Sequence, residues 1–185
     1  MPQDKPAILL TGRPGIGKTT AIHKIVSLLG GEAGGFYTRE VLIGGRRAGF
    51  ELATLTGERD WLASKEPGVA FAHQTPFKSY KINLDAINLL GVPALLRAME
   101  EGKVVIVDEI GPMEMLSPLF RQTIIKMLDS EAVVVGSVYQ RPNPFADRVK
   151  AHPRVTVKEI TLENRDRLPA EVAGMLAWSD IEKRT

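Results

Sequence analysis

The sequence has no cysteine, few histidines and almost no excess of charge of either sign. Without cysteine among its 185 residues, the chain has no disulfide, no thiolate nucleophile and no cysteine-based zinc site. The 24 lysines and arginines against 22 aspartates and glutamates leave a net charge of +2. This charge is too small for the basic surface of a dedicated nucleic-acid binder, so nucleic acid is not an expected partner. His23, His73 and His152 have no ligand-like spacing, and we expect no metal site built on them.

Long hydrophobic runs are also missing. The longest apolar runs, such as 104–107 and 132–135, are far shorter than the roughly 20 residues that span a membrane. Residues 1–6 contain no basic segment followed by a long apolar one, so the N-terminus predicts no secretory signal. We therefore expect a soluble protein that does not contact a membrane and resides in the cytoplasm.

The composition is that of a globular protein. Hydrophobic residues make up 44% of the chain and charged residues 25%, values close to globular averages, which excludes disordered, collagen-like and coiled-coil classes. At roughly 150 residues per domain, the length predicts a single domain over residues 1–185.

Short apolar segments alternate with segments of helical periodicity along most of the chain. The expected strands are 7–10, 104–107, 132–138 and 155–160, and the expected helices are 19–29, 85–102, 118–128, 144–150 and 169–178. Asp85 and Ser117 are the expected N-caps of the second and third helices. This alternation is typical of the α/β class, with a mainly parallel sheet covered by helices on both faces.

Two segments interrupt the alternation. Residues 36–43 and 48–55 are rich in strand formers, and residues 44–47 between them predict the turn of an inserted β-hairpin. Residues 57–79 mix glycine, proline and charged residues with isolated apolar ones. For this stretch we expect irregular structure with short strands near Trp61 and Val69.

The most informative segment matches the phosphate-binding P-loop in every fixed position; it reads Gly12-Arg13-Pro14-Gly15-Ile16-Gly17-Lys18-Thr19. It follows a predicted buried strand and opens a predicted helix. In that context, successive backbone N–H groups and the positive end of the helix face a phosphate. The three glycines let the backbone curl closely around the anion. The alternative, a glycine-rich turn with a solvated lysine, does not require this context.

Each residue of the loop has an expected role. The backbone N–H groups from Gly15 to Thr20 form the phosphate cradle, and Lys18 reaches the β and γ phosphates. Thr19 offers its hydroxyl to Mg²⁺. Pro14 has no N–H and therefore lies outside the set of donors.

A second segment ends a predicted buried strand in two carboxylates; it reads Lys103-Val104-Val105-Ile106-Val107-Asp108-Glu109 and resembles a Walker B strand. Ligands of open α/β sheets bind at the carboxyl ends of the strands, so Asp108 is expected beside the P-loop, where it supports Mg²⁺. Glu109 resembles the general base of ATPases that carry a glutamate directly after the Walker B aspartate. A solvated strand end is the alternative reading.

Four further segments make a family resemblance specific. Together with the P-loop, the chain resembles the small nucleoside-triphosphatase family known from thermophiles and related to the human cancer-related NTPase, on the segments at 35–41, 47–50, 107–114 and 164–166. The resemblance spans nearly the whole chain, although 57–79 matches no motif. It implies a RecA-like P-loop fold and Mg²⁺-dependent hydrolysis of nucleoside triphosphates with broad base tolerance. It also assigns the P-loop to residues 12–19 and the Walker B pair to Asp108 and Glu109.

Four other positions have two readings each. Glu114 is either a carboxylate near the site or a solvent-exposed residue at a helix entry. Arg46 and Arg47 are either a contact for phosphate or nucleic acid, or a solvated turn. Asn164 opens a polar loop after the last strand, where it either contacts a nucleobase or ribose or caps the last helix. Arg141 follows a strand and is either an arginine finger that meets the γ-phosphate or a surface arginine.

These residues leave three functions open. The first is an NTP phosphohydrolase that uses water as acceptor, acts as a monomer or weak oligomer and needs no nucleic acid. The second is a P-loop kinase that transfers phosphate to a nucleotide or other small molecule, with Glu109 deprotonating the acceptor. The third is a switch or nucleic-acid-stimulated ATPase, which the near-neutral charge disfavours.

Overall fold

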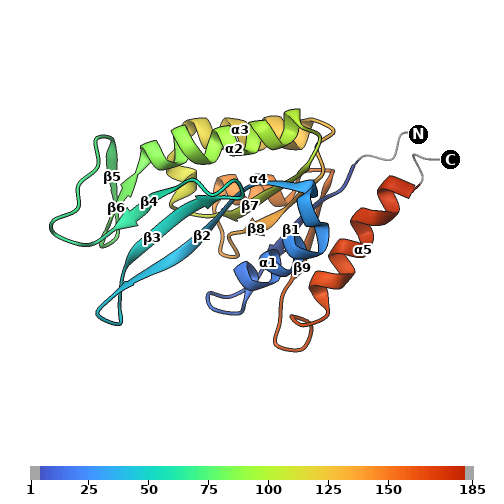
Figure 1. Cartoon of the computed structure of the whole chain (residues 1–185), viewed down its shortest axis with the longest axis horizontal. Helices are drawn as coiled ribbons and strands as arrows, with labels where there is room; N and C mark the ends of the chain where they lie inside the picture. The colour runs from blue at the N-terminus through green and yellow to red at the C-terminus, as the bar shows by residue number, and fades with distance from the viewer. Residues whose placement is uncertain (1–4, 182–185) are drawn as a thin grey trace.

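The structure is a computed structural model that describes residues 5–181, apart from the side chains of 177–181. One nine-stranded sheet runs through this part of the chain in the order β5-β6-β4-β3-β2-β7-β8-β1-β9 (Figure 1). The strands are β1 (Ala7–Thr11), β2 (Ala33–Ile43), β3 (Arg46–Thr54), β4 (Arg59–Ser64), β5 (Gln74–Phe77), β6 (Tyr80–Asn83), β7 (Val104–Ile110), β8 (Val134–Val138) and β9 (Val155–Glu159). From β2 to β9 in this order, neighbouring strands are parallel, whereas β2 to β5 pair antiparallel.

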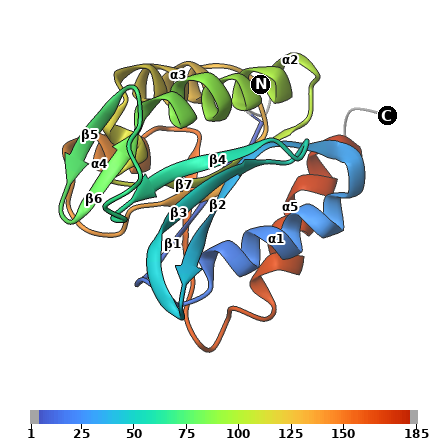
Figure 2. The ribbon, with the colours of Figure 1, turned by 60° about the vertical axis from the view of Figure 1, so that its left-hand side comes forward.

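Helices cover both faces of the sheet, as the sequence predicts for the α/β class. The helices are α1 (Lys18–Leu29), α2 (Val92–Glu100), α3 (Pro118–Asp129), α4 (Pro144–Lys150) and α5 (Leu168–Ile181), with the short helical segments η1 (Gly30–Glu32), η2 (Ala86–Gly91) and η3 (Glu114–Leu116). η2 is a π-helix that continues directly into α2. Figure 2 shows α1 beside α5 on one face and α2 beside α3 on the other. Within residues 5–181, no helix is long and apolar enough to cross a membrane. Residues 1–4, on which the prediction of no secretory signal partly rests, lie outside the described residues.

The strand β1 shows how the sequence produces the two packed layers. Its successive side chains point to opposite faces of the sheet, as in any strand. Ile8 and Leu10 pack in the core under α1 and α5, while Ala7 and Leu9 belong to the core under α2, α3 and α4. All four side chains are fully buried. A continuous apolar run is therefore required here, because both faces of this parallel strand are covered.

The predicted hairpin is present as β2 and β3, but its turn is shorter than 44–47. Ile43 pairs with Arg46, so only Gly44 and Gly45 form the turn. Both glycines have positive φ, 56° and 74°, as a two-residue hairpin turn requires. The prediction of Arg46 and Arg47 as turn residues is therefore wrong, because both lie in β3.

The stretch 57–79 contains more regular structure than the sequence predicts. The strand expected near Trp61 is confirmed as β4, but no strand forms at Val69. The chain there follows a loop, held by the Lys81 ammonium, which donates to the carbonyl oxygens of Glu66 and Val69. The next strands are β5 and β6, which pair with each other and extend the antiparallel half of the sheet.

One of the two predicted caps is confirmed. The Ser117 hydroxyl accepts a hydrogen bond from the Phe120 N–H at 3.0 Å and begins α3. Asp85 lies at the N-cap position of η2, as predicted, but its side chain makes no capping hydrogen bond there, because its carboxylate pairs with His73 at 2.9 Å. The Asn83 side-chain oxygen accepts from the backbone N–H of Asp85 instead, at 3.1 Å, and the helical segment then opens with η2.

Candidate active site

The P-loop joins β1 to α1 at the carboxyl edge of the parallel strands. Gly12 and Gly17 have φ of 150° and 112°, in a region that other residues rarely adopt. A Cβ on Gly12 would also lie 2.9 Å from the Ile160 carbonyl oxygen, so the loop needs glycine there for space as well as conformation. The tight backbone turn predicted for the P-loop is therefore explained by the positive φ of its glycines and by the lack of space for a side chain at Gly12.

The N-terminus of α1 is open toward this loop. Gly17 at the N-cap provides no side-chain hydrogen bond, and the first turn has no acidic residue. The unpaired backbone N–H groups and the positive helix end are therefore available to an anion. The Lys18 ammonium donates to the Gly12 carbonyl oxygen at 2.9 Å and so lies across the loop. This arrangement suits a phosphate group.

Asp108 lies in β7, at the same edge of the sheet, and is 1% exposed. β8 separates β7 from β1, and its Ser137 hydroxyl donates to Asp108 Oδ1 at 2.5 Å. Burial raises the pKa of Asp108, while the hydroxyls of Ser137 and Thr19 and the ammonium of Lys18 counteract this shift. The structure therefore brings Asp108 together with the P-loop residues, as predicted.

The second oxygen of Asp108 indicates a cation. Asp108 Oδ2 is buried and makes no hydrogen bond within the described part of the chain. Buried polar atoms are rarely left without a partner, and a carboxylate oxygen beside a threonine hydroxyl is a donor set that hard divalent cations prefer. Asp108 and Thr19 thus fit a divalent metal ion.

Glu109 is half-buried directly after Asp108. Desolvation raises its pKa most, the negative charge of Asp108 raises it further, and the positive charge of Lys18 lowers it. A carboxylate whose proton affinity is increased in this way is suited to accept a proton.

Glu114 lies at a helix entry but is buried, so its interpretation as a solvent-exposed residue is wrong. The residue opens η3 and is 5% exposed. The turn is closed by the Met115 N–H, which donates to the Gly111 carbonyl oxygen at 3.0 Å and folds the segment back under β7. Burial raises the pKa of Glu114 to about 8, and the charges of Glu109 and Asp108 contribute in the same direction. Three acidic side chains therefore lie close together at the end of one strand.

Sequence reasoning missed Ser137 and a pair of residues at a nearby cavity. The available signal for Ser137 was a hydroxyl inside an otherwise apolar strand. A cavity of about 380 Å³ beside the P-loop is lined by Arg13, Ile16, Gln140, Glu159, Ile160, Thr161, Leu162 and Glu163. The Gln140 amide donates to the Glu159 carboxylate at 3.5 Å across this cavity. No sequence motif connects these two residues.

Asn164 and Arg141 follow β9 and β8 at the same edge of the sheet as the P-loop, and in the described part of the chain no hydrogen bond or ion pair joins either side chain to residues 12–19. The Asn164 side chain accepts from the Thr161 N–H and donates to the Glu159 carbonyl oxygen, both at 2.8 Å, which fixes the loop after β9. Arg141 is exposed in the loop after β8, and within residues 5–176 its side chain has no hydrogen bond or ion pair. Contact of either residue with a nucleotide stays a prediction.

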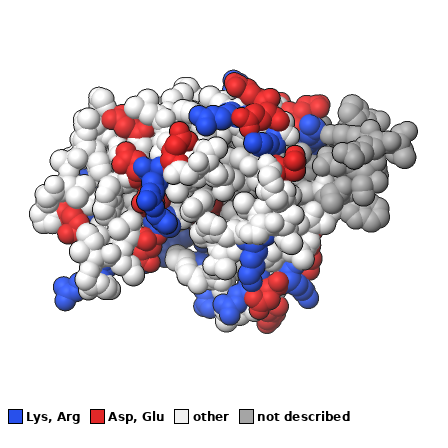
Figure 3. Space-filling model, viewed as in Figure 1, with Lys and Arg blue, Asp and Glu red and all other residues white. Residues whose placement is uncertain are grey.

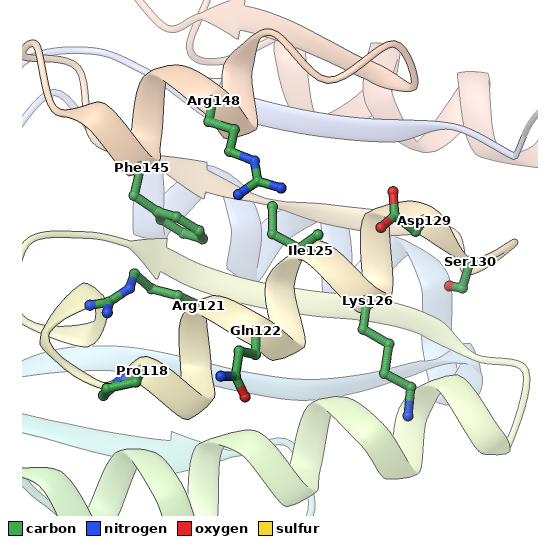
Figure 4. A pocket seen from close by; sticks show the side chains of 9 residues that line it. All are labelled: Pro118, Arg121, Gln122, Ile125, Lys126, Asp129, Ser130, Phe145 and Arg148. Carbon is green, nitrogen blue, oxygen red and sulfur yellow. The ribbon is translucent and has the colours of Figure 1, made fainter.

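A larger hollow lies elsewhere. A cavity of about 760 Å³ lies between α3 and α4. Figure 4 shows Phe145 and Arg148 projecting from α4 toward α3 beside it. Its lining residues are Pro118, Arg121, Gln122, Ile125, Lys126, Asp129, Ser130, Phe145 and Arg148. The lining includes no P-loop residue and none of the three acids, so the size of this cavity does not identify it as the reaction site.

Surface charge gives no sign of a nucleic-acid interface on the face drawn in Figure 3. Lysines and arginines there alternate with aspartates and glutamates, and no broad area of one sign appears. Ion pairs such as Arg39 with Glu51 at 2.6 Å and Lys150 with Asp147 at 2.8 Å neutralise local charge.

A glycine-rich loop between a strand and a helix, beside a buried strand-end aspartate, defines the class of P-loop NTPase folds. The chain belongs to the NTPase family, whose family model matches residues 7–173. The nucleoside-triphosphatase THEP1 of Thermotoga petrophila is 41% identical over 172 residues, which cover 93% of each chain. THEP1 of Thermofilum pendens is 40% identical, over 91% of this chain and 94% of its own.

Two solved structures are similar along nearly their whole length. The crystal structure of THEP1 from Aquifex aeolicus has a TM-score of 0.81 and 34% identity, and covers 92% of this chain and 98% of its own. The solution structure of a human cancer-related nucleoside triphosphatase has a TM-score of 0.76 and 32% identity, and covers 93% and 97%. The family resemblance and the P-loop α/β fold expected from the sequence are therefore confirmed.

Proposed function

We propose that this chain hydrolyses nucleoside triphosphates to nucleoside diphosphate and inorganic phosphate with the help of Mg²⁺. The observation that carries the proposal is one juxtaposition at the sheet edge. An uncapped helix N-terminus and Lys18 lie beside Asp108, whose buried Oδ2 has no hydrogen bond in the described chain, and beside Glu109. Membership of the NTPase family supports the same activity.

The phosphates bind on the loop and the start of α1. The residues that form this site are Gly12, Arg13, Pro14, Gly15, Ile16, Gly17, Lys18, Thr19 and Thr20. The backbone N–H groups of residues 15–20 surround the phosphate oxygens, and the Lys18 ammonium moves from the Gly12 carbonyl to the β and γ phosphates. The negatively charged phosphates of the NTP are stronger acceptors for the Lys18 ammonium than the neutral Gly12 carbonyl oxygen, and they take its place.

Thr19 and Asp108 hold the metal. Mg²⁺ prefers oxygen ligands, keeps several waters and binds NTP phosphates, so one hydroxyl and one carboxylate are a suitable protein contribution. When bound, the ion offsets the negative charge of the phosphates and of the buried Asp108 carboxylate.

Glu109 accepts a proton from the attacking water. The water oxygen forms a bond to the γ-phosphorus. The bond between that phosphorus and the β–γ bridging oxygen breaks, and its electron pair stays on the bridging oxygen, which leaves as part of the diphosphate. Glu109 then returns the proton to the products. Lys18 and, as an arginine finger, Arg141 offset the charge that develops on the transferred group.

The nucleobase occupies the cavity of about 380 Å³ beside Arg13 and Ile16. Its polar rim consists of the Gln140 amide, which can donate or accept, and the Glu159 carboxylate, which accepts. An amide that can turn over accommodates several bases, which agrees with the broad base tolerance that the family resemblance implies. Asn164 fixes the adjacent loop, and its contact with the ribose or base remains a prediction.

Phosphate release separates hydrolysis from the two alternatives. With Mg²⁺ and ATP or GTP alone, a hydrolase releases phosphate continuously, whereas a kinase requires an acceptor and a nucleic-acid-stimulated ATPase requires RNA or DNA. We expect release without either addition, from a cytoplasmic protein that is a monomer or weak oligomer. Release that appears only with an acceptor, or rises many-fold with RNA, would contradict the proposal.

A further inference from the structure

The cavity between α3 and α4 has no role in the proposed reaction, yet it is the larger of the two cavities described above. Its volume of about 760 Å³ lies within the range of about 300 to 1,000 Å³ that is typical of sites for small molecules. Its lining comes from α3, from α4 and from Ser130, the residue after α3. A molecule bound there would therefore leave the phosphate-binding loop free.

Helical spacing places an arginine and an apolar side chain on each wall of this cavity. On α3, Arg121 and Ile125 are four residues apart and therefore lie on the same face of the helix. On α4, Phe145 and Arg148 are three residues apart, and Figure 4 shows both projecting toward α3. The two helices thus present the same pair of chemical groups to the space between them.

The apolar surface of the cavity comes mainly from Ile125 and Phe145. Both side chains are half-buried, and Phe145 packs against the core under α2, α3 and α4. This packing holds the aromatic ring in place, while the part that lines the cavity remains accessible to water. Removing apolar surface from water is favourable, so these two side chains favour a ligand with an apolar body.

Positive charge lies beside this apolar surface and has no partner of opposite charge. Arg121, Lys126 and Arg148 line the cavity, and within residues 5–176 none of the three forms an ion pair. The Arg121 guanidinium donates to the Met115 carbonyl oxygen, but this acceptor is neutral and leaves the positive charge uncompensated. A bound anion would supply the missing partner.

The nearby carboxylates do not neutralise these groups. Asp147, on α4, pairs with Lys150 at 2.8 Å. Asp129, which lines the cavity, lies 3.2 Å from His152 Nε2. Asp129 also comes eight residues after Arg121, which places it about 12 Å further along α3 at a rise of 1.5 Å per residue. The end of the cavity at Arg121 therefore carries an excess of positive charge.

We propose that this cavity binds a small organic anion that has a planar apolar ring and a phosphate or carboxylate group. The ring covers the apolar side chains of Ile125 and Phe145. The anionic group accepts hydrogen bonds from Arg121 and Arg148, because the planar guanidinium group forms paired hydrogen bonds with the oxygens of a phosphate or carboxylate. The site lies apart from the proposed hydrolytic site, so its test does not depend on hydrolysis.

Binding of 1-naphthyl phosphate, measured by titration calorimetry with Mg²⁺-ADP in excess, tests the proposal. The ADP is added to occupy the phosphate-binding loop, so that the probe reports on the second site. We expect one saturable site per chain with a Kd below about 1 mM. The compound 1-naphthol lacks the phosphate, and inorganic phosphate lacks the ring. Each should bind at least about tenfold more weakly than 1-naphthyl phosphate, because each makes only half of the contacts.

Two substitutions locate the bound probe. Arg148→Gln removes the charge of an exposed side chain that has no ion pair in the described chain, and it should weaken binding at least about tenfold. Gln122→Glu adds a negative charge to the lining without changing its shape, and it should also weaken binding. Arg59→Gln is the matched control, because Arg59 is an exposed arginine outside the cavity. This control should bind the probe as tightly as the parent.

The absence of saturable binding up to about 10 mM 1-naphthyl phosphate would overturn the proposal. Parental affinity in both Arg148→Gln and Gln122→Glu would do the same, because the probe would then bind elsewhere. Binding of 1-naphthol as tight as that of 1-naphthyl phosphate would show an apolar site that does not recognise the anion. A glutamate-rich helical peptide that binds more tightly than the probe and loses affinity in Arg148→Gln would identify a protein-docking surface instead.

Discussion

The pKa of Glu114 makes the stability of the protein depend on pH in a defined window. Burial raises this pKa from the ordinary 4.5 to about 8 in the folded chain. As pH rises above 4.5, the unfolded chain loses this proton while the folded chain keeps it, so the free energy of unfolding falls with pH. The fall ends near pH 8, where the folded chain loses the proton as well. Below pH 4.5, Glu114 has no effect of this kind.

The size of this effect follows from the width of the window. At 1.36 kcal/mol for each pH unit, Glu114 destabilises the folded chain by roughly 3 kcal/mol at pH 7 and on the order of 5 kcal/mol above pH 8. A typical domain has a free energy of unfolding of about 5 to 15 kcal/mol, so the effect is large enough to measure. Glutamine has nearly the same shape and does not titrate. Glu114→Gln should therefore be more stable than the parent at pH 8 by an amount of this order.

Urea unfolding at a series of pH values from 4 to 9 measures the effect, on protein without metal or nucleotide. The difference in free energy of unfolding between Glu114→Gln and the parent should increase steadily with pH between about 4.5 and 8 and be constant outside this window. Glu131→Gln, at an exposed glutamate, is the matched control for the loss of one carboxylate. A Glu114→Gln difference that does not change with pH would refute the reasoning.

Three further substitutions test other parts of the site. Lys18→Ala should weaken Mg²⁺-ATP binding about ten- to a hundredfold in equilibrium dialysis, because a charge-assisted contact to the phosphates is lost; unchanged affinity in folded protein would contradict the P-loop assignment. Ser137→Ala should lower the free energy of unfolding by about 1 to 3 kcal/mol in urea at pH 8, because the buried Asp108 Oδ1 loses its donor; equal stability would show that this bond contributes nothing. Arg141→Ala should release phosphate at least about tenfold more slowly with unchanged nucleotide affinity, and a parental rate would remove Arg141 as the arginine finger.

The phosphate-binding end of the site could be predicted from the sequence because its requirements are local. Gly12 and Gly17 adopt backbone conformations that favour glycine, and the residues that follow them form the helix N-terminus itself. The strand β7 that carries Asp108 is equally local, since its apolar residues are buried on both faces, although it continues through Asp108 and Glu109 to Ile110 instead of ending at 107 as predicted. The spacing of such residues along the chain therefore predicts their local arrangement in the fold.

The rest of the site depends on contacts between distant segments. Ser137 reaches Asp108 across two neighbouring strands, and Gln140 meets Glu159 only because β8 and β9 flank β1. Glu114 is buried by the way its turn folds under β7, and its own sequence neighbourhood is compatible with an exposed position. Pairings of this kind leave no pattern in a single sequence.

The antiparallel half of the sheet also contains one element that its local sequence predicts and one that depends on a distant partner. The two glycines of the β2–β3 turn are a local signal, and the hairpin was predictable from them. The strand β5 contains Pro76 and, among the described strands, pairs only with β6 at the edge of the sheet, so its stability comes from that partner rather than from its own residues. The local sequence of 57–79 therefore predicts irregular structure, although its end forms the strand β5.

The measurement that tests the account most directly is Mg²⁺-ATP binding and phosphate release by Glu109→Gln, with Asp108→Asn beside it. Glutamine keeps the shape of Glu109 and loses its basicity, so Glu109→Gln should bind Mg²⁺-ATP as tightly as the parent and hydrolyse it at least about a hundredfold more slowly. Asp108→Asn should lose Mg²⁺ affinity as well as rate. Near-parental phosphate release by Glu109→Gln would contradict the assignment of Glu109 as the general base.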